Sequence, residues 1–532
     1  MVDRRSGLFG FVAVGAVRSV AGRLARRGSG VPSRAAMLAG SIAVVAVLGG
    51  AAAAGTKVPR WFGASYDDRL PAYSQFDNAF GKLGVLNESG DVPTKGHPFL
   101  APLGANGRAC VTCHQPGNAM SISTDSLRAH WQQAGFRDPV FAAIDGSNCP
   151  NLPQDKRASH SLLLDHALFR VPRPWPPRDL SGKAIEPEFS IEVVRDPTGC
   201  NLDRKYGIKS ADPTISVYRR PRVVANMRFV TSDDTNPRAV IGNKTGLPRA
   251  QDPETGKFIY LPLLADGAQP STRRQSNAAA TGHQGFVGKL SADQLKQLDD
   301  FMMQIYVAQD YSNGAGRIGG PGGPQGLGTA GFKDTPGPRS AMREDRQVFK
   351  TMEEWRHKTP KTPAEEFQAS VVRGYDVFFR RPFFIKDVAN FTDIGMGNPY
   401  KRTCAICHNV QLSGIDNAPG FMDIGVENQP WADPAPHLPL FKLTCKPTAK
   451  PHPYLGRVIY TSDPGRALIS GRCMDIGNIN LSQLRGLAAR APYFTNGSAK
   501  DLPTLVDFYN RRFAMKLSPR EKTDLVNFLS VL

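Results

Sequence analysis

The spacing of apolar residues predicts amphipathic helices in both halves of the chain. Along residues 291–306 apolar side chains recur every three or four positions, and Ser291 stands where a helix N-cap is expected. A similar pattern covers residues 364–379. Near the C-terminus Ser518 and Glu521 form a capping box ahead of another apolar stripe. Because alternating patterns are scarce and short, the sequence predicts a mainly α fold.

Glycine and proline interrupt these patterns and suggest how the chain is divided. The 532 residues include 52 Gly and 43 Pro, so we expect two or three domains with long irregular connections. Residues 313–340 are rich in both and show no periodicity, which is typical of a linker. We therefore expect a leader at 1–56, an N-terminal domain at 57–308, a linker at 309–363 and a C-terminal domain at 364–532.

The first 55 residues have the pattern of an export signal. Residues 35–55 are uncharged and mostly apolar, and they follow a stretch that carries five arginines between positions 18 and 34. These 21 residues are just long enough to cross a bilayer, which takes about 20. Residues 52–54 also offer a small-residue cleavage site. We expect a periplasmic protein, either soluble after cleavage or anchored to the inner membrane through 35–55.

Two pentapeptides carry the most specific chemistry in the chain. They are Cys110-Val-Thr-Cys113-His114 and Cys404-Ala-Ile-Cys407-His408. Each reads C-x-x-C-H, the attachment signal for c-type haem, in which two thiols bind the vinyl groups and the histidine coordinates the iron. A single copy could instead be half of a zinc site or a redox dithiol, but neither copy has a second ligand pair nearby. The sequence therefore predicts two covalent haem c groups in two cytochrome c-like domains.

The other four cysteines agree with an exported protein. Cys149 and Cys200 lie in one half of the chain, and Cys445 and Cys473 lie in the other. In an oxidising periplasm each pair can form a disulfide. Free buried thiols are the alternative, and geometry decides between the two.

The charge of the chain bears on its partners. The formal net charge is +19, part of which belongs to the arginine-rich leader. A basic body favours an acidic redox partner or an anionic membrane surface, although most of the charge is typical of a solvated surface. Nucleic acid is not expected as a partner of an exported haem protein.

Several segments resemble the bacterial di-haem cytochrome c peroxidase and MauG superfamily. Residues 484–498, LRGLAARAPYFTNGS, are similar to its C-terminal signature, and residues 104–120, 145–149 and 218–226 are similar to its N-terminal half. The resemblance implies an exported enzyme that reacts with hydrogen peroxide at the first haem and shares two oxidising equivalents with the second. The electrons would come from a small redox protein, or from a protein substrate that is modified, as in MauG-like enzymes.

The resemblance also implies a sixth ligand for the second haem. Peroxidases of the superfamily place a methionine there and MauG-like members a tyrosine; the matching residue here is Tyr509. A phenolate would lower the haem potential relative to a thioether, so Tyr509 favours the MauG-like subtype. Packing within a helix is the alternative role for Tyr509, and Met474 and Tyr493 are the other candidate ligands.

Further site residues follow from the same resemblance. On the peroxide side of the first haem, Gln275 matches a family glutamine and His283 lies near the position of a family glutamate. A histidine there could move the peroxide proton; a surface loop histidine is the alternative. The family also binds calcium between its haems, and the matching positions are Asn226, Arg490 and Pro492.

Two departures from the superfamily pattern affect this interpretation. The Trp-Asp-Gly-Arg run that often supplies a relay between the haems is absent, since residues 229–240 read FVTSDDTNPRAV. The histidine that binds the resting first haem is also not assignable, with His130, His160 and His166 as candidates. A non-enzymatic di-haem electron-transfer cytochrome is the rival hypothesis.

Overall fold

The computed structural model describes residues 58–64, 68–230, 263–333, 348–349, 351–357, 359–389, 397–408 and 421–532. The expected leader at 1–56, including segment 35–55, lies outside these residues, and none of the helices within them has the length and apolarity to cross a membrane. Residues from Ala54 to Leu532 belong to one unit of mutually contacting chain. The boundaries expected at 308 and 363 stay a prediction.

The prediction of a mainly α fold is wrong, because the chain is about 30% helical and 19% strand, with many small sheets. The largest sheet has the order β2-β3-β8-β9, and a second has the order β14-β13-β6. Four two-stranded sheets pair β1 with β4, β5 with β7, β10 with β11 and β12 with β15. The strands are β1 (Arg69–Leu70), β2 (Tyr73–Asn78), β3 (Gly81–Asn87), β4 (Val92–Pro93), β5 (Phe169–Pro174), β6 (Phe189–Arg195), β7 (Thr214–Arg219), β8 (Ile305–Ser312), β9 (Gly316–Arg317), β10 (Phe383–Ile385), β11 (Tyr400–Arg402), β12 (Phe421–Met422), β13 (Leu440–Cys445), β14 (Val458–Thr461) and β15 (Ile479–Asn480).

Burial explains why the apolar pattern did not reveal these strands. The first five residues of β8 are all buried, so the strand has no polar alternation that would distinguish it from a helix. The helix expected over 291–306 in fact ends at Gln304, and Ile305 begins β8. Strand β8 then pairs with β3 in an antiparallel register that sets Val307 opposite Val85. Tertiary pairing thus converted the end of a predicted helix into a strand.

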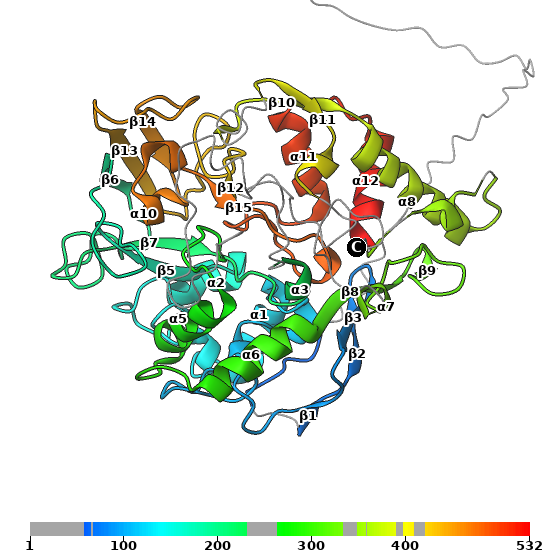
Figure 1. Cartoon of the computed structure of the whole chain (residues 1–532), viewed down its shortest axis with the longest axis horizontal. Helices are drawn as coiled ribbons and strands as arrows, with labels where there is room; N and C mark the ends of the chain where they lie inside the picture. Colours follow the sequence, from blue (N-terminus) through cyan, green and yellow to red (C-terminus); the bar gives the residue numbers. More distant parts are fainter. Residues whose placement is uncertain are drawn as a thin grey trace, which may run out of the picture. The chain divides into compact units, whose positions relative to one another are not determined.

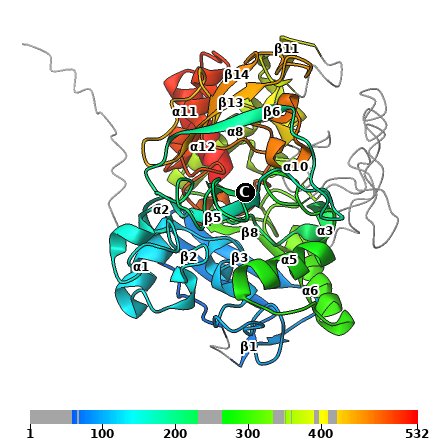
Figure 2. The same ribbon diagram turned by 90° about the vertical axis from the view of Figure 1, so that its left-hand side faces the viewer.

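The predicted helices are otherwise confirmed, and Figures 1 and 2 both show α8, α11 and α12 side by side. Helix α12 has the capping box of Ser518 and Glu521, and Thr362 caps α8. The helices are α1 (Thr124–Ala134), α2 (Ser161–His166), α3 (Met227–Val230), α5 (Thr272–Gln284), α6 (Ala292–Gln304), α7 (Ala330–Lys333), α8 (Pro363–Arg380), α10 (Ala467–Ser470), α11 (Leu502–Arg512) and α12 (Pro519–Ser530).

Segments from both halves of the sequence are joined by a sheet, and each half contains one disulfide. Strand β6 pairs with β13, so that Val193 lies opposite Phe441. The expected disulfides are confirmed: the Cα atoms of Cys149 and Cys200 are 5.3 Å apart, and those of Cys445 and Cys473 are 5.8 Å apart. Both separations lie within the range that a disulfide requires.

The apolar core gathers around the two C-x-x-C-H motifs. One buried cluster, formed largely by α8, α11 and α12, packs against Cys404, Cys407 and Tyr509. Another, which includes residues of β3, α6 and β8, packs against Cys110. Each motif therefore has its own apolar surroundings.

The packing of α8 against α12 depends on Gly374. A Cβ atom added there would lie 2.0 Å from the backbone oxygen of Asp524 and 2.7 Å from the Cβ of Phe528. We expect Gly374→Ala to lower the free energy of unfolding by about 1–3 kcal/mol, because the helices would have to separate. Gly282→Ala is the matched control, since a Cβ added there in α5 meets nothing within 4 Å. Helix propensity should make that control neutral or stabilising by up to about 1 kcal/mol in urea unfolding. Equal effects of the two variants would contradict this account.

Candidate functional site

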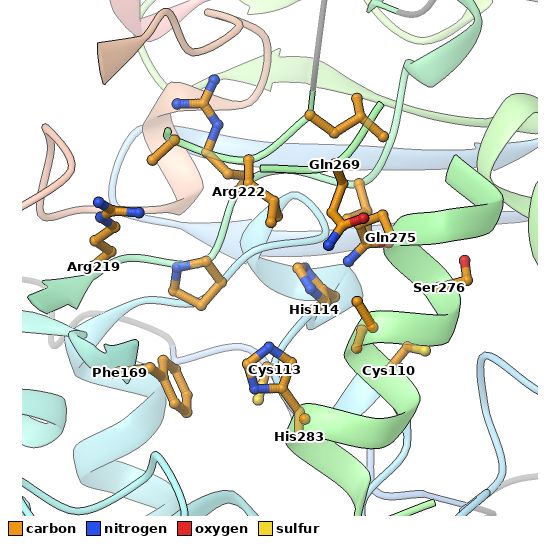
Figure 3. Close-up of a pocket in the computed structure, with 18 of the residues that line it drawn as sticks. Cys110, Cys113, His114, Phe169, Arg219, Arg222, Gln269, Gln275, Ser276 and His283 are labelled. Carbon is orange, nitrogen blue, oxygen red and sulfur yellow. The ribbon is translucent and has the colours of Figure 1, made fainter. Parts of the chain in front are cut away.

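The first motif forms a tight turn that places its three functional side chains on one cavity wall. Residues Cys110–Thr112 form a 3-10 helix, and the backbone N–H groups of Cys113 and His114 both donate to the carbonyl of Cys110, at 3.2 and 3.1 Å. Cys110, Cys113 and His114 all line a cavity of about 360 Å³, the His114 cavity (Figure 3). The C-x-x-C-H spacing thus corresponds to a single turn of backbone, and this turn brings the two thiols and the imidazole to the same cavity.

The imidazole of His114 is held in the state that a metal ligand needs. Its Nδ1 lies 3.1 Å from the carbonyl oxygen of Met120, and a carbonyl can only accept, so Nδ1 carries the hydrogen. The lone pair is therefore on Nε2. Burial lowers the pKa of His114 to about 4, which keeps the ring neutral. Metal-ligating histidines commonly donate their second ring N–H to such a carbonyl, which fixes the tautomer and the ring orientation.

The second motif repeats the same turn. Residues Cys404–Ile406 form a 3-10 helix, and Cys407 and His408 donate to the carbonyl of Cys404 at 3.2 and 3.1 Å, as in the first motif. His408 lines two smaller cavities of about 120 and 100 Å³, the His408 cavities, and Cys404 and Cys407 line the smaller of them. Two segments far apart in the chain therefore adopt one local geometry.

The cysteines of both motifs border apolar side chains. Burial raises the pKa of Cys110, Cys113 and Cys404 to about 12 in each case, so these thiols are protonated when no group is bound. Within the described residues no group of three His, Cys, Asp or Glu side chains is placed to hold a metal ion. Two neutral thiols and a neutral imidazole beside a mostly apolar cavity fit haem c. The first motif shows this arrangement most completely, because all three of its side chains line one cavity.

Helix α5 supplies the opposite wall of the His114 cavity. Figure 3 shows Gln275 and His283 on the face of α5 that is turned toward Cys113 and His114, and both line the cavity. Ser271 caps the start of the helix, and Gly285 ends it in a left-handed conformation with φ 66°. The structure therefore brings together the two residues that the resemblance assigned to the peroxide side. Gln284, the next residue, donates to the sulfur of Cys110 at 3.5 Å.

A buried ion pair orients His283. Its Nδ1 lies 2.5 Å from a carboxylate oxygen of Asp145, whose other oxygen pairs with Arg108. The side chain of His283 is 50% exposed, whereas those of Asp145 and Arg108 are 4% and 1% exposed. Burial alone would raise the pKa of Asp145, but the charge of Arg108 and the bond to His283 outweigh it and lower the pKa. The carboxylate thus holds Nδ1–H and leaves Nε2 of His283 available to accept a proton.

Sequence reasoning did not assign a role to Asp145 or Arg108. Both lie in segments that resemble the superfamily, 104–120 and 145–149, and that resemblance was the available signal. Asp145 lies 138 residues from His283 in sequence and Arg108 lies 175 residues from it, so no local pattern reveals the partnership.

Tyr509 faces His408 across the His408 cavities. It belongs to α11 and lines both His408 cavities, with its ring centroid 6.5 Å from that of His408 and an angle of 84° between the rings. Burial raises the pKa of its phenol. No hydrogen bond joins its hydroxyl to any residue in the described part of the chain. The hydroxyl of Tyr493, in contrast, donates to the carbonyl of Leu487 at 2.9 Å.

The methionines near the second motif have different positions. Met474 does not line the His408 cavities and contacts the guanidinium of Arg472. Met422, which sequence reasoning did not consider, lines both cavities, and its sulfur lies 3.7 Å from that of Cys407. Met422 thus lies beside a cysteine of the motif, whereas Tyr509 faces the ring of His408.

Two of the residues assigned to calcium are bonded to other protein groups. The amide oxygen of Asn226 accepts from the N–H of Val307 at 3.0 Å, and its nitrogen donates to Gln483 at 2.8 Å. The carbonyl of Arg490 accepts from the guanidinium of Arg220 at 2.7 Å, and a cation there repels Ca²⁺. The carbonyl of Pro492, in contrast, accepts no hydrogen bond from the described residues; the N–H of Thr124 donates to the preceding carbonyl, that of Ala491. Calcium binding stays a prediction without support from these contacts.

The three candidate histidines for the resting first haem have structural partners. His130 stacks on Trp61 and its Nε2 lies 2.8 Å from Asp138. Both ring nitrogens of His160 face backbone carbonyls, and His166 stacks on His437 with 3.8 Å between ring centroids. None of the three lines the His114 cavity. Residues 229–240 lack the relay tryptophan of the superfamily, and of these the structure describes only 229 and 230.

Comparison with known proteins gives limited information. No family model matches the chain, and no curated protein does. Among solved structures, the chain is similar to a MauG-like protein associated with microbial copper homeostasis, with 17% sequence identity and a TM-score of 0.23. The alignment covers 49% of this chain and 57% of that one, less than two thirds of either.

The Arg108–Asp145 pair gives a pH-dependent prediction. We expect Asp145→Asn to lower the free energy of unfolding at pH 7 by about 3–5 kcal/mol, because Arg108 would be left buried without its carboxylate. The folded-state pKa of Asp145 is depressed, so the pair contributes fully above the ordinary aspartate pKa of about 4 and loses its contribution as the pH falls further. Urea unfolding of both proteins should therefore show a smaller difference at pH 3 than at pH 7. The same difference at both pH values would contradict the ion-pair interpretation.

Proposed function

We propose that this protein is an exported di-haem c-type oxidoreductase that reacts with hydrogen peroxide at the His114 site. The observation that supports this most is an asymmetry between two otherwise equivalent motifs. Both motifs form the same turn beside a cavity, but only the His114 cavity has a carboxylate-oriented histidine on its other wall. The second motif instead faces the partly buried Tyr509, and its larger cavity is lined by the carboxyl groups of Asp423 and Glu427 but by no second histidine. An electron-transfer cytochrome has no need of an acid–base group at one of its haems.

The residues of the His114 site have separate roles in this proposal. Cys110 and Cys113 would hold the haem through thioether bonds, and Nε2 of His114 would coordinate its iron. The haem would supply an iron centre that accepts peroxide and takes up oxidising equivalents. His283 would take a proton from peroxide at Nε2 and return it to the departing oxygen, which is general acid–base catalysis. Asp145 would keep the tautomer of His283 that makes this transfer possible.

The second site would store one oxidising equivalent and pass electrons. Cys404, Cys407 and His408 would hold its haem, and Tyr509 would be the sixth ligand. A buried phenol ligates only after it loses its proton, and an anionic oxygen stabilises oxidised iron. This preference favours the MauG-like subtype over an ordinary cytochrome c peroxidase.

The cell compartment and the electron donor are part of the same proposal. Two disulfides support an oxidising compartment, and we propose the periplasm, with segment 35–55 as a signal or membrane anchor. A small redox protein or a protein substrate would supply the electrons. The basic charge of the chain favours an acidic donor.

The central test is the number of covalent haems and their response to peroxide. The exported protein should carry two haems that survive denaturation and acid–acetone extraction, and one ferric haem should be high-spin and react with hydrogen peroxide. Absorption and EPR spectra before and after peroxide give this measurement. Tyr509 ligation predicts that the near-infrared band of Met-ligated ferric haem is missing; its presence would assign the ligand to Met422 or Met474. Two low-spin haems inert to peroxide would establish the electron-transfer alternative.

The role of His283 can be tested by substitution. His283→Ala should slow the reaction with peroxide by about 10²–10⁴-fold, the usual contribution of general acid–base catalysis, with both haems still attached. Stopped-flow absorption measures the rate. Thr281→Ala is the matched control, because it changes an exposed side chain on the same helix. An unaltered rate in His283→Ala would remove this residue from the mechanism and leave Gln275 or Gln284 as the candidate.

A further inference from the structure

The His114 cavity and the larger His408 cavity share a wall. Residues 220–223, which follow β7, line both cavities, and so do residues 480–483, which begin in β15. We call these two segments the partition. Its eight residues include no aromatic side chain.

Three arginines of this region have only backbone partners. Arg220 donates to the carbonyls of Ile122 and Arg490, at 2.5 and 2.7 Å. Arg222 donates to the carbonyls of Asn480 and Leu481, and Figure 3 shows its guanidinium directed away from His114. The side chain of Arg490, which lines the larger His408 cavity, donates to the carbonyl of Gln483. We call Arg220, Arg222 and Arg490 the arginine cluster.

Arg220 and Arg490 are buried and Arg222 is partly buried, and none of the three has a carboxylate partner among the described residues. Arg220 and Arg490 are 8% and 6% exposed, and the Nε atoms of both are buried without a hydrogen-bond acceptor. None of the three forms an ion pair with any residue that the structure describes. The neighbouring Arg219 provides the contrast, because its guanidinium pairs with Asp266 at 2.5 Å and with Asp463 at 2.6 Å.

The electrostatic cost of the cluster follows from its contacts. A guanidinium does not give up its proton in proteins, so all three side chains stay positively charged with only carbonyl oxygens as partners. Buried charges in proteins are normally paired, and the described protein groups leave these unpaired.

We infer that the arginine cluster binds the propionate carboxylates of the haems in both cavities. This inference rests on the proposed function. The cysteines of each motif bind the vinyl edge of the porphyrin, and the propionates lie on the opposite edge, where a polar wall is required. Arginine pairs with carboxylates through charge-assisted and often bidentate hydrogen bonds, which suits this role. The cluster belongs to the shared wall, so one group of cations would serve two prosthetic groups.

The inference predicts a pattern of redox potentials. A fixed positive charge near a haem disfavours its ferric state, so its removal should lower the midpoint potential. Arg490→Gln should act mainly on the second haem, because Arg490 lines only the His408 side, whereas Arg222→Gln should act on both. We expect at least a tenfold fall in the equilibrium constant for reduction of the affected haem, equal to 59 mV for one electron. Spectroelectrochemical titration of the intact holoprotein measures each haem.

Three comparisons make the test specific. Arg490→Lys and Arg222→Lys keep the charge and should restore most of the potential. Arg69→Gln removes the same charge from a 68% exposed side chain in β1 and should leave both potentials unchanged. In the unmodified protein, resonance Raman should show propionate bending modes typical of strong hydrogen bonds, a measurement that needs no variant.

The outcomes separate this inference from the function on which it rests. If the protein carries two covalent haems but the glutamine variants keep both potentials, or the propionates show no strong hydrogen bonds, the inference is overturned and the proposed function stands. A protein without covalent haem overturns both.

Discussion

The hydrogen bonds that close each C-x-x-C-H motif are the constraint on which the rest of the structure depends. In both motifs the N–H groups of the second cysteine and of the histidine share one carbonyl, that of the first cysteine. This turn places two thiols and one imidazole at the same cavity, and apolar side chains must then enclose the group that they bind. Helix α5 and the N-terminal core do so at the first motif, while α8, α11 and α12 do so at the second. These helices therefore line cavities at the motifs in addition to packing on one another.

Charge is placed in this interior in two different ways. Arg108 with Asp145, and Arg219 with Asp266 and Asp463, are compensated by carboxylates, so each pair keeps its geometry without an external partner. The arginine cluster is compensated only by carbonyl dipoles. Since both arrangements border the His114 cavity, the contrast between them cannot come from a general difference in burial. The contrast indicates that the carboxylate-paired arginines need no group beyond the protein, whereas the arginine cluster is suited to binding an anion.

Local chemistry could be predicted from the sequence, and long-range pairing could not. Capped amphipathic helices such as α12, the two motif turns and both disulfides depend on nearby residues or on strict chemical rules. The sheets depend on partners far away: β8 has no polar alternation because both of its faces are covered, and its first residue continues a helical pattern. The role of Asp145 could not be predicted for the same reason, because its partner His283 is distant in sequence and is brought to it only by folding.

The lack of an aromatic side chain in the partition changes how the two sites would communicate. A relay tryptophan is useful when two redox centres are separated by a thick insulating layer. Here each of the two segments of the partition, residues 220–223 and 480–483, lines both cavities. The layer between the cavities is therefore only one segment thick. An electron crossing it would pass covalent backbone and hydrogen bonds such as the one from Arg222 to Asn480. Arg220 and Arg222 line both cavities, so their charges would act on an electron at either site. The missing tryptophan is therefore compatible with a two-site enzyme, provided that the wall stays thin and its arginines stay charged.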